Sequence, residues 1–295
     1  MENVKISKVC GLCAGCSYAV NTALECIATH KNVVLFKEIV HNKNVNNMLK
    51  DKGIKTTDNL SELESSNHVI IRAHGEPPET YEFLNSKNIN FSDCTCKNVK
   101  SIHELVILYS LTHKIIIIGK YKKALHPEVF GTMGWCNNNY YLIEDKEDLD
   151  KLKNIKNENF YLVCQTTFNI QKAEMLIDEI KNIAIKNNCE LVVNKSLCAA
   201  QSAINKASKE LAKNSDVMIV VGGKNSSNSK ELYNNLSSVT NTIFIEDINT
   251  WFEEFAINNI ILTKDIKIGI TAGASTLKSE LVTLKNLIEE KLKEL

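Results

Sequence analysis

Arginine is almost absent from this chain of 295 residues: Arg72 is the only one among 35 lysine and arginine residues. An anion site must therefore use backbone N–H groups, hydroxyls, amides, imidazoles or lysine rather than an arginine clamp. The formal net charge is +0, with acids and bases mixed throughout. Because no basic stripe or tail is present, we expect no nucleic-acid partner.

Long apolar segments are missing as well. The first nine residues contain lysine and glutamate and lack the apolar core of a signal peptide. No apolar run approaches the length of a membrane span, so we expect a cytoplasmic protein with no membrane partner. In a reducing compartment, ten cysteines do not indicate a disulfide framework. Some should be small packing residues of the core, and we assign Cys26, Cys164 and Cys189 to this class.

Three cysteines share one local pattern, in which a strand-like segment leads to the cysteine and a helical pattern follows it. The strand-like segments span residues 4–9, 88–96 and 190–198, and the helical patterns begin near residues 18, 99 and 203. They place Cys13, Cys96 and Cys198 at equivalent positions, about one small α/β lobe apart. Three lobes that each bring one thiol to a strand end can converge on one centre.

Apolar strand patterns alternate with helical patterns along the whole chain, which predicts parallel sheets. We predict an α/β fold of three pseudo-repeated lobes around a central metal-cluster cavity, with lobes at residues 1–96, 97–195 and 196–295. Ligands of parallel sheets bind beyond the carboxyl ends of the strands. Polar residues follow two such strand ends in each lobe: His41 and His74, the His126–Glu128 loop and Thr166, and the Ser226–Asn228 loop and Ser275.

The three thiols leave the nature of the centre open. Singly, each is more often a buried packing residue than a ligand. Three sulfurs suit either a zinc ion with a fourth ligand or an iron–sulfur cluster with one iron free of protein ligands. A local Cys-x-x-Cys-x-x-Cys cluster around Cys13 is the competing arrangement. We favour packing roles for its outer members and for the neighbour of Cys96, namely Cys10, Cys16 and Cys94.

The polar strand ends predict an anion site. A histidine alone at such a position usually caps or turns the chain, but three at equivalent ends favour contacts with an anion. The loop at residues 222–229 is rich in donors and precedes a helix, where oxyanion binding competes with simple N-capping. It lacks the P-loop pattern. Glu128 is a solvated loop carboxylate unless a closed cavity makes it a proton donor.

Eight motifs, taken together, resemble those of the 4-hydroxy-3-methylbut-2-enyl diphosphate reductase family. They run in order along almost the whole chain, and their combination is specific although each alone is weak. The loop at residues 120–125 departs from the family by its length. The motifs are Gly11-Leu12-Cys13-Ala14-Gly15, Glu38-Ile39-Val40-His41-Asn42, Ala73-His74-Gly75, Asp93-Cys94-Thr95-Cys96, His126-Pro127-Glu128-Val129, Gln165-Thr166-Thr167, Lys224-Asn225-Ser226-Ser227-Asn228-Ser229 and Thr271-Ala272-Gly273-Ala274-Ser275.

The resemblance implies a [4Fe–4S] cluster with Cys13, Cys96 and Cys198 as ligands and one iron not ligated by protein. Glu128 and Thr166 match the catalytic positions that handle the proton and the substrate hydroxyl. Cys198 is assigned mainly from the internal repeat, since its neighbours match only loosely. The diphosphate-binding positions are His41, His74, His126, Ser226, Ser227, Asn228 and Ser275.

The predicted function is reductive dehydroxylation of 4-hydroxy-3-methylbut-2-enyl diphosphate to isopentenyl and dimethylallyl diphosphate. Electrons arrive one at a time, with ferredoxin or flavodoxin as the expected donor, and the protein is expected to be a monomer. Glu128 supplies a proton as water leaves. The alternative is a binding protein: an iron–sulfur electron carrier, or a zinc-stabilised protein for a phosphorylated ligand.

Overall fold

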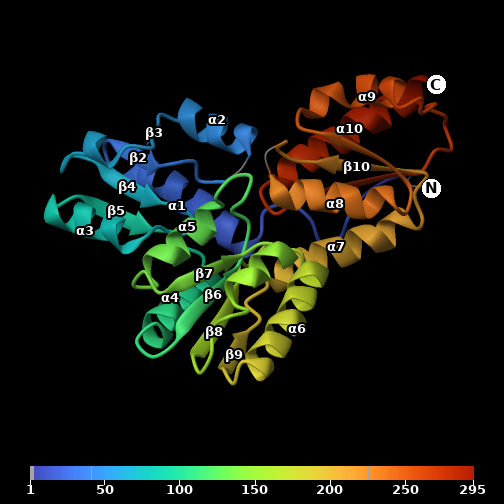
Figure 1. Cartoon of the computed structure of the whole chain (residues 1–295). Helices are drawn as coiled ribbons and strands as arrows, with labels where there is room; N and C mark the ends of the chain where they lie inside the picture. Colours follow the sequence, from blue (N-terminus) through green and yellow to red (C-terminus); the bar gives the residue numbers. More distant parts are fainter. Residues whose placement is uncertain (1–2, 41, 225) are drawn as a thin grey trace. The chain divides into compact units, whose positions relative to one another are not determined.

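A computed structural model describes residues 3–40, 42–224 and 226–295. Strands and helices alternate along the chain, and every strand pairing in the three four-stranded sheets of this part is parallel. The chain divides into two compact units (Figure 1). The first unit contains residues 1–18, 40–52 and 199–295, and the second contains residues 19–39 and 53–198.

The sheet of the first unit contains both the first and the last strand of the chain. Its strand order is β1-β12-β10-β11, so the first strand lies at one edge beside the last one. The register pairs Ile6 with Ile270. The strands are β1 (Val4–Ile6), β12 (Ile268–Ala272), β10 (Val217–Val221) and β11 (Asn241–Ile245).

Helices cover both faces of this sheet, which is why its central strands are apolar on both sides. Alternate residues of β10 enter different cores: Ile219 packs in the cluster of α9 and α10, and Met218 packs in the cluster of α7 and α8. The helical segments are α2 (Lys43–Asp51), α7 (Ala199–Ala212), α8 (Ser227–Ser237), the 3₁₀ turn η3 (Ile248–Thr250), α9 (Trp251–Ile257) and α10 (Lys278–Glu294).

The second unit contains two sheets, each built around an apolar central strand. Residues 115–118 of β6 are buried, as an inner parallel strand requires. The strand orders are β3-β2-β4-β5 and β7-β6-β8-β9. The strands are β2 (Val33–Phe36), β3 (Lys55–Thr57), β4 (His68–Ile71), β5 (Asn90–Asp93), β6 (Lys114–Ile118), β7 (Tyr140–Ile143), β8 (Asn159–Cys164) and β9 (Glu190–Asn194).

The helices of the second unit connect these strands, and α1 is shared because the division of the chain passes through it. Side chains of α4 and α6 pack on opposite faces of the β6 sheet, where Ile117 and Ile116 meet them respectively. The helical segments are α1 (Ala14–Thr29), η1 (Leu60–Glu62), α3 (Pro78–Ser86), α4 (Lys97–Tyr109), α5 (Pro127–Gly134), η2 (Lys146–Lys151) and α6 (Ile170–Lys186).

The predicted fold class, three α/β lobes with parallel sheets, is confirmed. Two details differ from the prediction. Strand β1 joins the sheet at the end of the chain rather than that of the first lobe. The segment after His126, expected to be a loop, is helix α5, whose first residue is Pro127. Proline suits this position because its missing N–H has no intrahelical partner there. The lobe boundaries at residues 96/97 and 195/196 remain a prediction.

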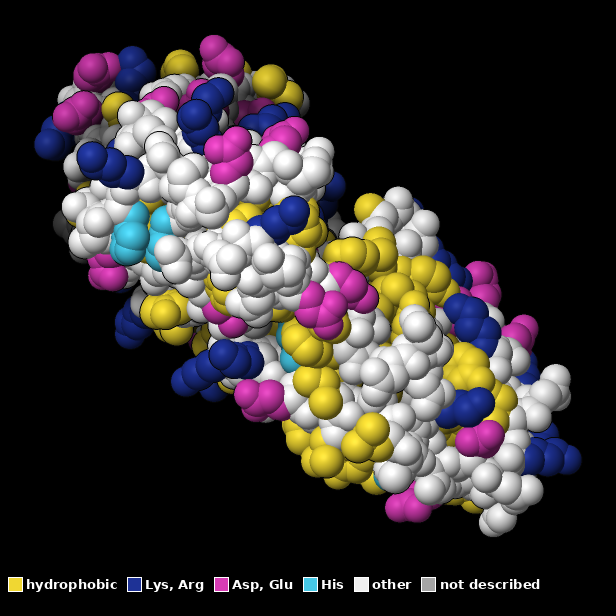
Figure 2. All heavy atoms as spheres, turned by 90° about the vertical axis from the view of Figure 1, so that its left-hand side faces the viewer, with side chains coloured by type: hydrophobic (Ala, Val, Ile, Leu, Met, Phe, Trp, Pro, Cys, Tyr) yellow, Lys and Arg dark blue, Asp and Glu magenta, His cyan; other side chains and the backbone are white. Residues whose placement is uncertain are grey.

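The structure shows how charge is distributed on one face of the surface and how apolar the helices are. Lys and Asp or Glu side chains are dispersed over the face in Figure 2 and do not gather into a patch of one sign. Across the parts of the chain that the structure describes, no helix has both the length and the apolar character needed to cross a membrane.

Candidate functional site

Each of the three predicted cysteine ligands lies at the start of a helix. Cys13 immediately precedes α1, Cys96 is the N-cap residue of α4, and Cys198 immediately precedes α7. All three are partly exposed. A helix N-terminus favours negative charge, so these are suitable places for a ligand to a metal centre.

In the first unit, the Cys13 loop is held against the loop that follows β12. The Cys13 N–H donates to Ala274 O at 3.2 Å, and the Leu12 N–H donates to Thr276 O at 2.8 Å. The pKa of the Cys13 thiol is lowered to about 6, chiefly by a hydrogen bond from the Cys16 side chain and with help from backbone N–H groups, although burial opposes the shift. Cys16 therefore has a contact with the predicted ligand beyond the packing role expected of it.

The donor-rich loop after β10 closes tightly onto the end of the same sheet. Ser226 is the N-cap of α8, and its Oγ accepts the N–H of Ser229 at 3.3 Å and the Ser229 hydroxyl at 3.1 Å. A Cβ on Gly222 or Gly273 would lie 2.2 or 2.5 Å from Ser229 Oγ. Only glycine lets both strand ends approach the helix start so closely.

Two predicted anion ligands of the first unit have buried polar atoms without a protein partner. Among the described residues, Asn228 Oδ1 and Ser275 Oγ make no hydrogen bond. Buried polar atoms are normally paired, so both atoms favour a bound partner. The Ser275 hydroxyl can donate to an anion, whereas Asn228 Oδ1 can only accept from a donor group. His41 and the side chain of Ser227 lie outside the described residues, and their predicted roles stay predictions.

In the second unit, backbone hydrogen bonds link Cys198 to the predicted catalytic residue Thr166, and Cys96 to the neighbour of the predicted anion ligand His74. The Cys96 N–H donates to Ala73 O at 3.0 Å, next to His74, and the Cys198 N–H donates to Thr166 O at 2.7 Å. Asn98, in the first turn of α4, points Nδ2 at Cys198 Sγ from 3.8 Å. Sequence reasoning missed Asn98, since an amide two residues after a cysteine is an ordinary helix-start residue.

Glu128 and Thr166 form a buried pair. The Thr166 N–H donates to Glu128 Oε1 at 2.5 Å, and the Thr166 hydroxyl donates to Oε2 at 2.7 Å. The carboxyl lies among apolar side chains such as Ile117 and Val163. Burial raises the pKa of Glu128 to about 7, although both Thr166 hydrogen bonds lower it. A carboxyl that titrates near neutrality suits proton donation.

Two predicted anion-binding histidines are neighbours in the same unit. The rings of His74 and His126 lie edge to face with centroids 5.6 Å apart. His126 Nδ1 accepts the N–H of Glu128 at 3.2 Å, which caps α5. In a neutral ring this bond puts the proton on Nε2, so that nitrogen is a donor for an anion.

The only arginine has a structural partner. Arg72 Nε donates to Glu76 Oε1 at 2.7 Å, and Lys37 Nζ donates to Oε2 at 2.8 Å. Glu76 is fully buried, and Arg72 is 7% exposed. The arginine thus neutralises a buried carboxylate, which agrees with an anion site that relies on other donors.

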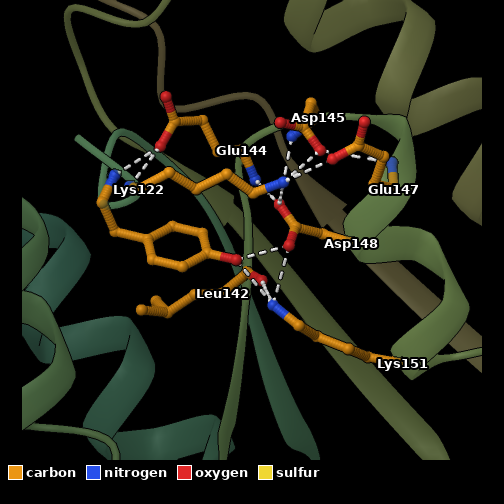
Figure 3. Close-up of polar contacts among 8 residues, drawn as sticks. Lys122, Leu142, Glu144, Asp145, Glu147, Asp148 and Lys151 are labelled. Carbon is orange, nitrogen blue, oxygen red and sulfur yellow. Dashed lines mark hydrogen bonds and ion pairs between the residues drawn. The ribbon is translucent and has the colours of Figure 1, made fainter.

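The loop at residues 120–125 is anchored by a polar network (Figure 3). The backbone N–H groups of Tyr121 and Lys122 both donate to Glu144 Oε2 at 2.7 Å. The Tyr121 hydroxyl and Lys151 Nζ donate to Asp148, which is 5% exposed. The loop therefore leads into His126 in a defined conformation.

The structure thus assembles two groups of predicted site residues, one in each unit. The second unit holds Cys96, Cys198, His74, His126, Glu128 and Thr166, and the first unit holds Cys13, Ser226, Asn228 and Ser275. Each group combines thiols with polar donors. Metal ligation and anion binding by these residues remain predictions.

A family model described as "LytB protein" matches residues 4–289. The chain is similar to a 4-hydroxy-3-methylbut-2-enyl diphosphate reductase of Clostridioides difficile, with 34% identity over 97% of this chain and 100% of that protein.

Two solved structures have the same fold. One is the E-1-hydroxy-2-methyl-but-2-enyl-4-diphosphate reductase from Plasmodium falciparum, with a TM-score of 0.83 and 26% identity, covering 97% of this chain and 87% of that one. The other is described as (E)-4-hydroxy-3-methyl-but-2-enyl diphosphate reductase, the terminal enzyme of the non-mevalonate pathway. Its TM-score is 0.72 and its identity 31%, covering 99% of this chain and all of that one.

Proposed function

Because the chain belongs to the LytB protein family, we propose that it is a 4-hydroxy-3-methylbut-2-enyl diphosphate reductase. The reaction replaces the C4–O bond by a C–H bond, consumes two electrons and two protons, and releases water. The products are isopentenyl and dimethylallyl diphosphate. The observation that supports it most is Glu128, a buried carboxyl with a pKa near 7 whose Thr166 partner also accepts the N–H of Cys198.

The donor set fits an iron–sulfur cluster. Cys13, Cys96 and Cys198 are partly exposed thiols at helix starts, and the pKa of Cys13 is lowered to about 6, so this thiol is available as a thiolate near neutral pH. When bound, a [4Fe–4S] cluster supplies electrons one at a time and an iron that acts as a Lewis acid on the C4 oxygen. Ferredoxin or flavodoxin is the proposed source of the electrons.

Glu128 is the proposed proton donor to the departing hydroxyl. Its burial keeps a proton available at neutral pH, and the Thr166 hydroxyl fixes the carboxyl orientation through Oε2. Without a proton, the departing group would be hydroxide, which leaves poorly. General acid catalysis of this kind typically contributes about 10²–10⁴-fold to the rate.

The diphosphate is the proposed ligand of the neutral donors. Ser226 lies at the start of α8, and the buried Ser275 hydroxyl has no protein partner in the described residues and can donate to the anion. Asn228 would donate through its Nδ2 group, because its Oδ1 is an acceptor. Nε2 of neutral His126 is a further donor. Together with helix N–H groups they provide hydrogen bonds for a charged ligand while the only arginine is held by Glu76.

The test is turnover by anaerobically purified protein. We expect protein with bound iron and sulfide, given 4-hydroxy-3-methylbut-2-enyl diphosphate, dithionite and a viologen, to form both five-carbon diphosphates. Product identity is read by NMR, and iron and sulfide are assayed in the same sample. A protein that cycles redox states without forming product would be an electron carrier instead. A colourless protein that retains zinc but no sulfide would overturn the cluster assignment.

A further inference from the structure

A cysteine and two histidines outside the proposed active site lie together in the second unit. They are Cys26 and His30 on α1 and at its end, and His68 at the start of β4. One ligand atom from each lies within 4.8 Å of the other two. Of these three residues, the sequence analysis assigned only Cys26, as a packing residue of the core, because nothing in the sequence shows that residue 68 meets this end of α1.

The spacing of Cys26 and His30 brings both side chains to the same side of the last turn of α1. They are four residues apart, and the His30 N–H donates to Cys26 O at 2.8 Å, which continues the helical turn. His68 stacks on His30 with ring centroids 3.9 Å apart and planes 27° apart. Two protonated imidazoles at this distance would repel each other, because they carry like charges.

Hydrogen bonds already fix one nitrogen of each ring. His68 Nε2 pairs with Ser92 Oγ at 2.8 Å, and His30 Nδ1 pairs with Thr29 Oγ1 at 2.8 Å. This leaves His68 Nδ1 and His30 Nε2 as the nitrogens for another partner. His68 Nδ1 is buried and makes no hydrogen bond to any described residue. Metal-bound histidines typically have this arrangement, with the second nitrogen oriented by a neighbouring polar group.

The same serine also contacts the thiol. Cys26 Sγ lies 3.6 Å from Ser92 Oγ, so one hydroxyl neighbours two of the three ligand residues. Cys26 is 5% exposed, whereas His30 is exposed and forms part of the wall of a surface pocket that Glu64 and Asn67 also line. A water molecule from this pocket can complete a four-coordinate site.

We propose that Cys26, His30 and His68 form a second metal site that binds a Zn²⁺ ion, separate from the proposed cluster. Sulfur and imidazole donors without a carboxylate favour zinc over calcium or magnesium. In a tetrahedral zinc site, neighbouring ligand atoms are about 3.5 Å apart. The three ligand atoms, which lie within 4.8 Å of one another, must therefore move closer together when the ion binds.

The last turn of helix α1 contains no lysine or arginine, and Lys31 follows two residues after the helix ends. A helix C-terminus favours positive charge, which is compatible with a bound cation at this end of α1. The ion would join the end of α1 to the start of β4.

The test compares zinc retention by the full-length protein and its variants. All are purified anaerobically in the same way, incubated with excess Zn²⁺, desalted and assayed for zinc by mass spectrometry. We expect His30→Gln to hold one equivalent less than the wild type, and Cys26→Ala and His68→Gln to do the same. Zinc at the cluster cysteines is common to all samples and cancels in the difference.

Matched controls separate this site from general effects of losing a histidine or a thiol. His113 makes the same Nδ1 contact with its preceding threonine, Thr112, at 2.8 Å but has no cysteine beside it, so His113→Gln should keep the wild-type zinc content. Cys136→Ala, at another buried thiol, should keep it too.

A second measurement uses Co²⁺ as the probe. The wild type should show a sulfur-to-cobalt charge-transfer band that the Cys26→Ala protein lacks in the difference spectrum. Zinc content in His30→Gln equal to that of the wild type, or a cobalt spectrum unchanged by Cys26→Ala, would overturn the proposal. Neither measurement depends on reductase turnover, so failure here leaves the proposed function unaffected.

Discussion

Glu128 accepts hydrogen bonds on both carboxylate oxygens from the same residue, Thr166: 2.5 Å from its N–H and 2.7 Å from its hydroxyl. This geometry fixes the carboxyl plane against the end of β8. Burial raises its pKa, the two hydrogen bonds lower it, and the value of about 7 leaves both protonation states accessible near neutral pH.

We predict that Glu128→Gln loses turnover by roughly two or more decades while keeping cluster and substrate affinity. Glutamine preserves size and can still pair with Thr166, but it has no acidic proton. Anaerobic single-turnover reduction with excess dithionite measures this, with iron content as the control. Near-normal turnover would assign the proton to another group, and loss of iron would make Glu128 structural.

Glu128→Gln should also change how the stability of the protein depends on pH. Because the pKa of folded Glu128 is raised from 4.5 to about 7, the folded state keeps a proton that the unfolded chain releases in this interval. This contribution to stability is complete below pH 4.5 and disappears as pH rises through 7. As pH rises through this range, the melting temperature of the wild type should therefore fall relative to that of Glu128→Gln. If the melting temperatures of the two proteins change with pH in parallel, the raised pKa is contradicted.

Alkylation should distinguish Cys13 from the buried thiols. Its pKa of about 6 makes it a thiolate at pH 7, whereas burial raises the pKa of Cys94 to about 11. In protein freed of iron, we expect iodoacetamide to label Cys13 well before Cys94, as read by peptide mass spectrometry. Cys16→Ala should slow the labelling at pH 7, since the Cys16 hydrogen bond is the largest lowering cause. Equal rates in both proteins would exclude this contact.

Alanine substitution should have opposite effects at two buried serines of the first unit. Ser275 Oγ has no partner among the described residues, whereas Ser208 Oγ pairs with Thr271 Oγ1 at 2.6 Å. Ser275→Ala should weaken inorganic diphosphate binding about tenfold and leave the ligand-free melting temperature unchanged or higher. Ser208→Ala should lower that temperature and leave binding intact. Calorimetry measures the diphosphate affinity of both variants, and thermal melts measure their stability. A normal diphosphate affinity in Ser275→Ala would show that Ser275 is not part of the anion site.

The network around Asp148 should stabilise the protein above pH 4. Burial alone would raise the Asp148 pKa, but hydrogen bonds from Tyr121, Lys151 and two backbone N–H groups outweigh it and hold the pKa below its usual range. Asp148→Asn should cost about 1–3 kcal/mol of unfolding free energy at pH 7, measured with urea. The deficit should shrink as pH falls below 3.8, where the unfolded carboxyl is protonated. A deficit independent of pH would rule out a charge effect.

Local pattern predicted the strands and helices well, because each buried strand is an apolar run and each following helix has its own periodicity. Strand β6, for example, spans residues 114–118, where the sequence is Lys followed by four isoleucines. The pattern could not show which strands pair. Strand β1 is three residues long and gives no signal that its neighbour is β12.

The candidate site was predicted unevenly for similar reasons. The positions of Cys13, Cys96 and Cys198 at helix starts follow from the strand–cysteine–helix pattern. The burial of Glu128 does not, since His-Pro-Glu was expected to be a loop and the structure makes it the first turn of α5. Contacts such as Asn98 with Cys198 depend on residues 100 positions apart, which no local pattern reports.

The pairing of β1 with β12 also bears on the order in which the protein is made and folded. The partners of the Cys13 loop, Ala274 and Thr276, lie about 260 residues further along the chain. As the chain emerges from the ribosome, the backbone hydrogen bonds of this loop cannot form until those residues have been made, whereas the β6 sheet can assemble earlier from residues 114–194. Any metal centre that uses Cys13 is therefore completed only after residue 276 has been synthesised, and a truncation before residue 268 would leave that cysteine without its support.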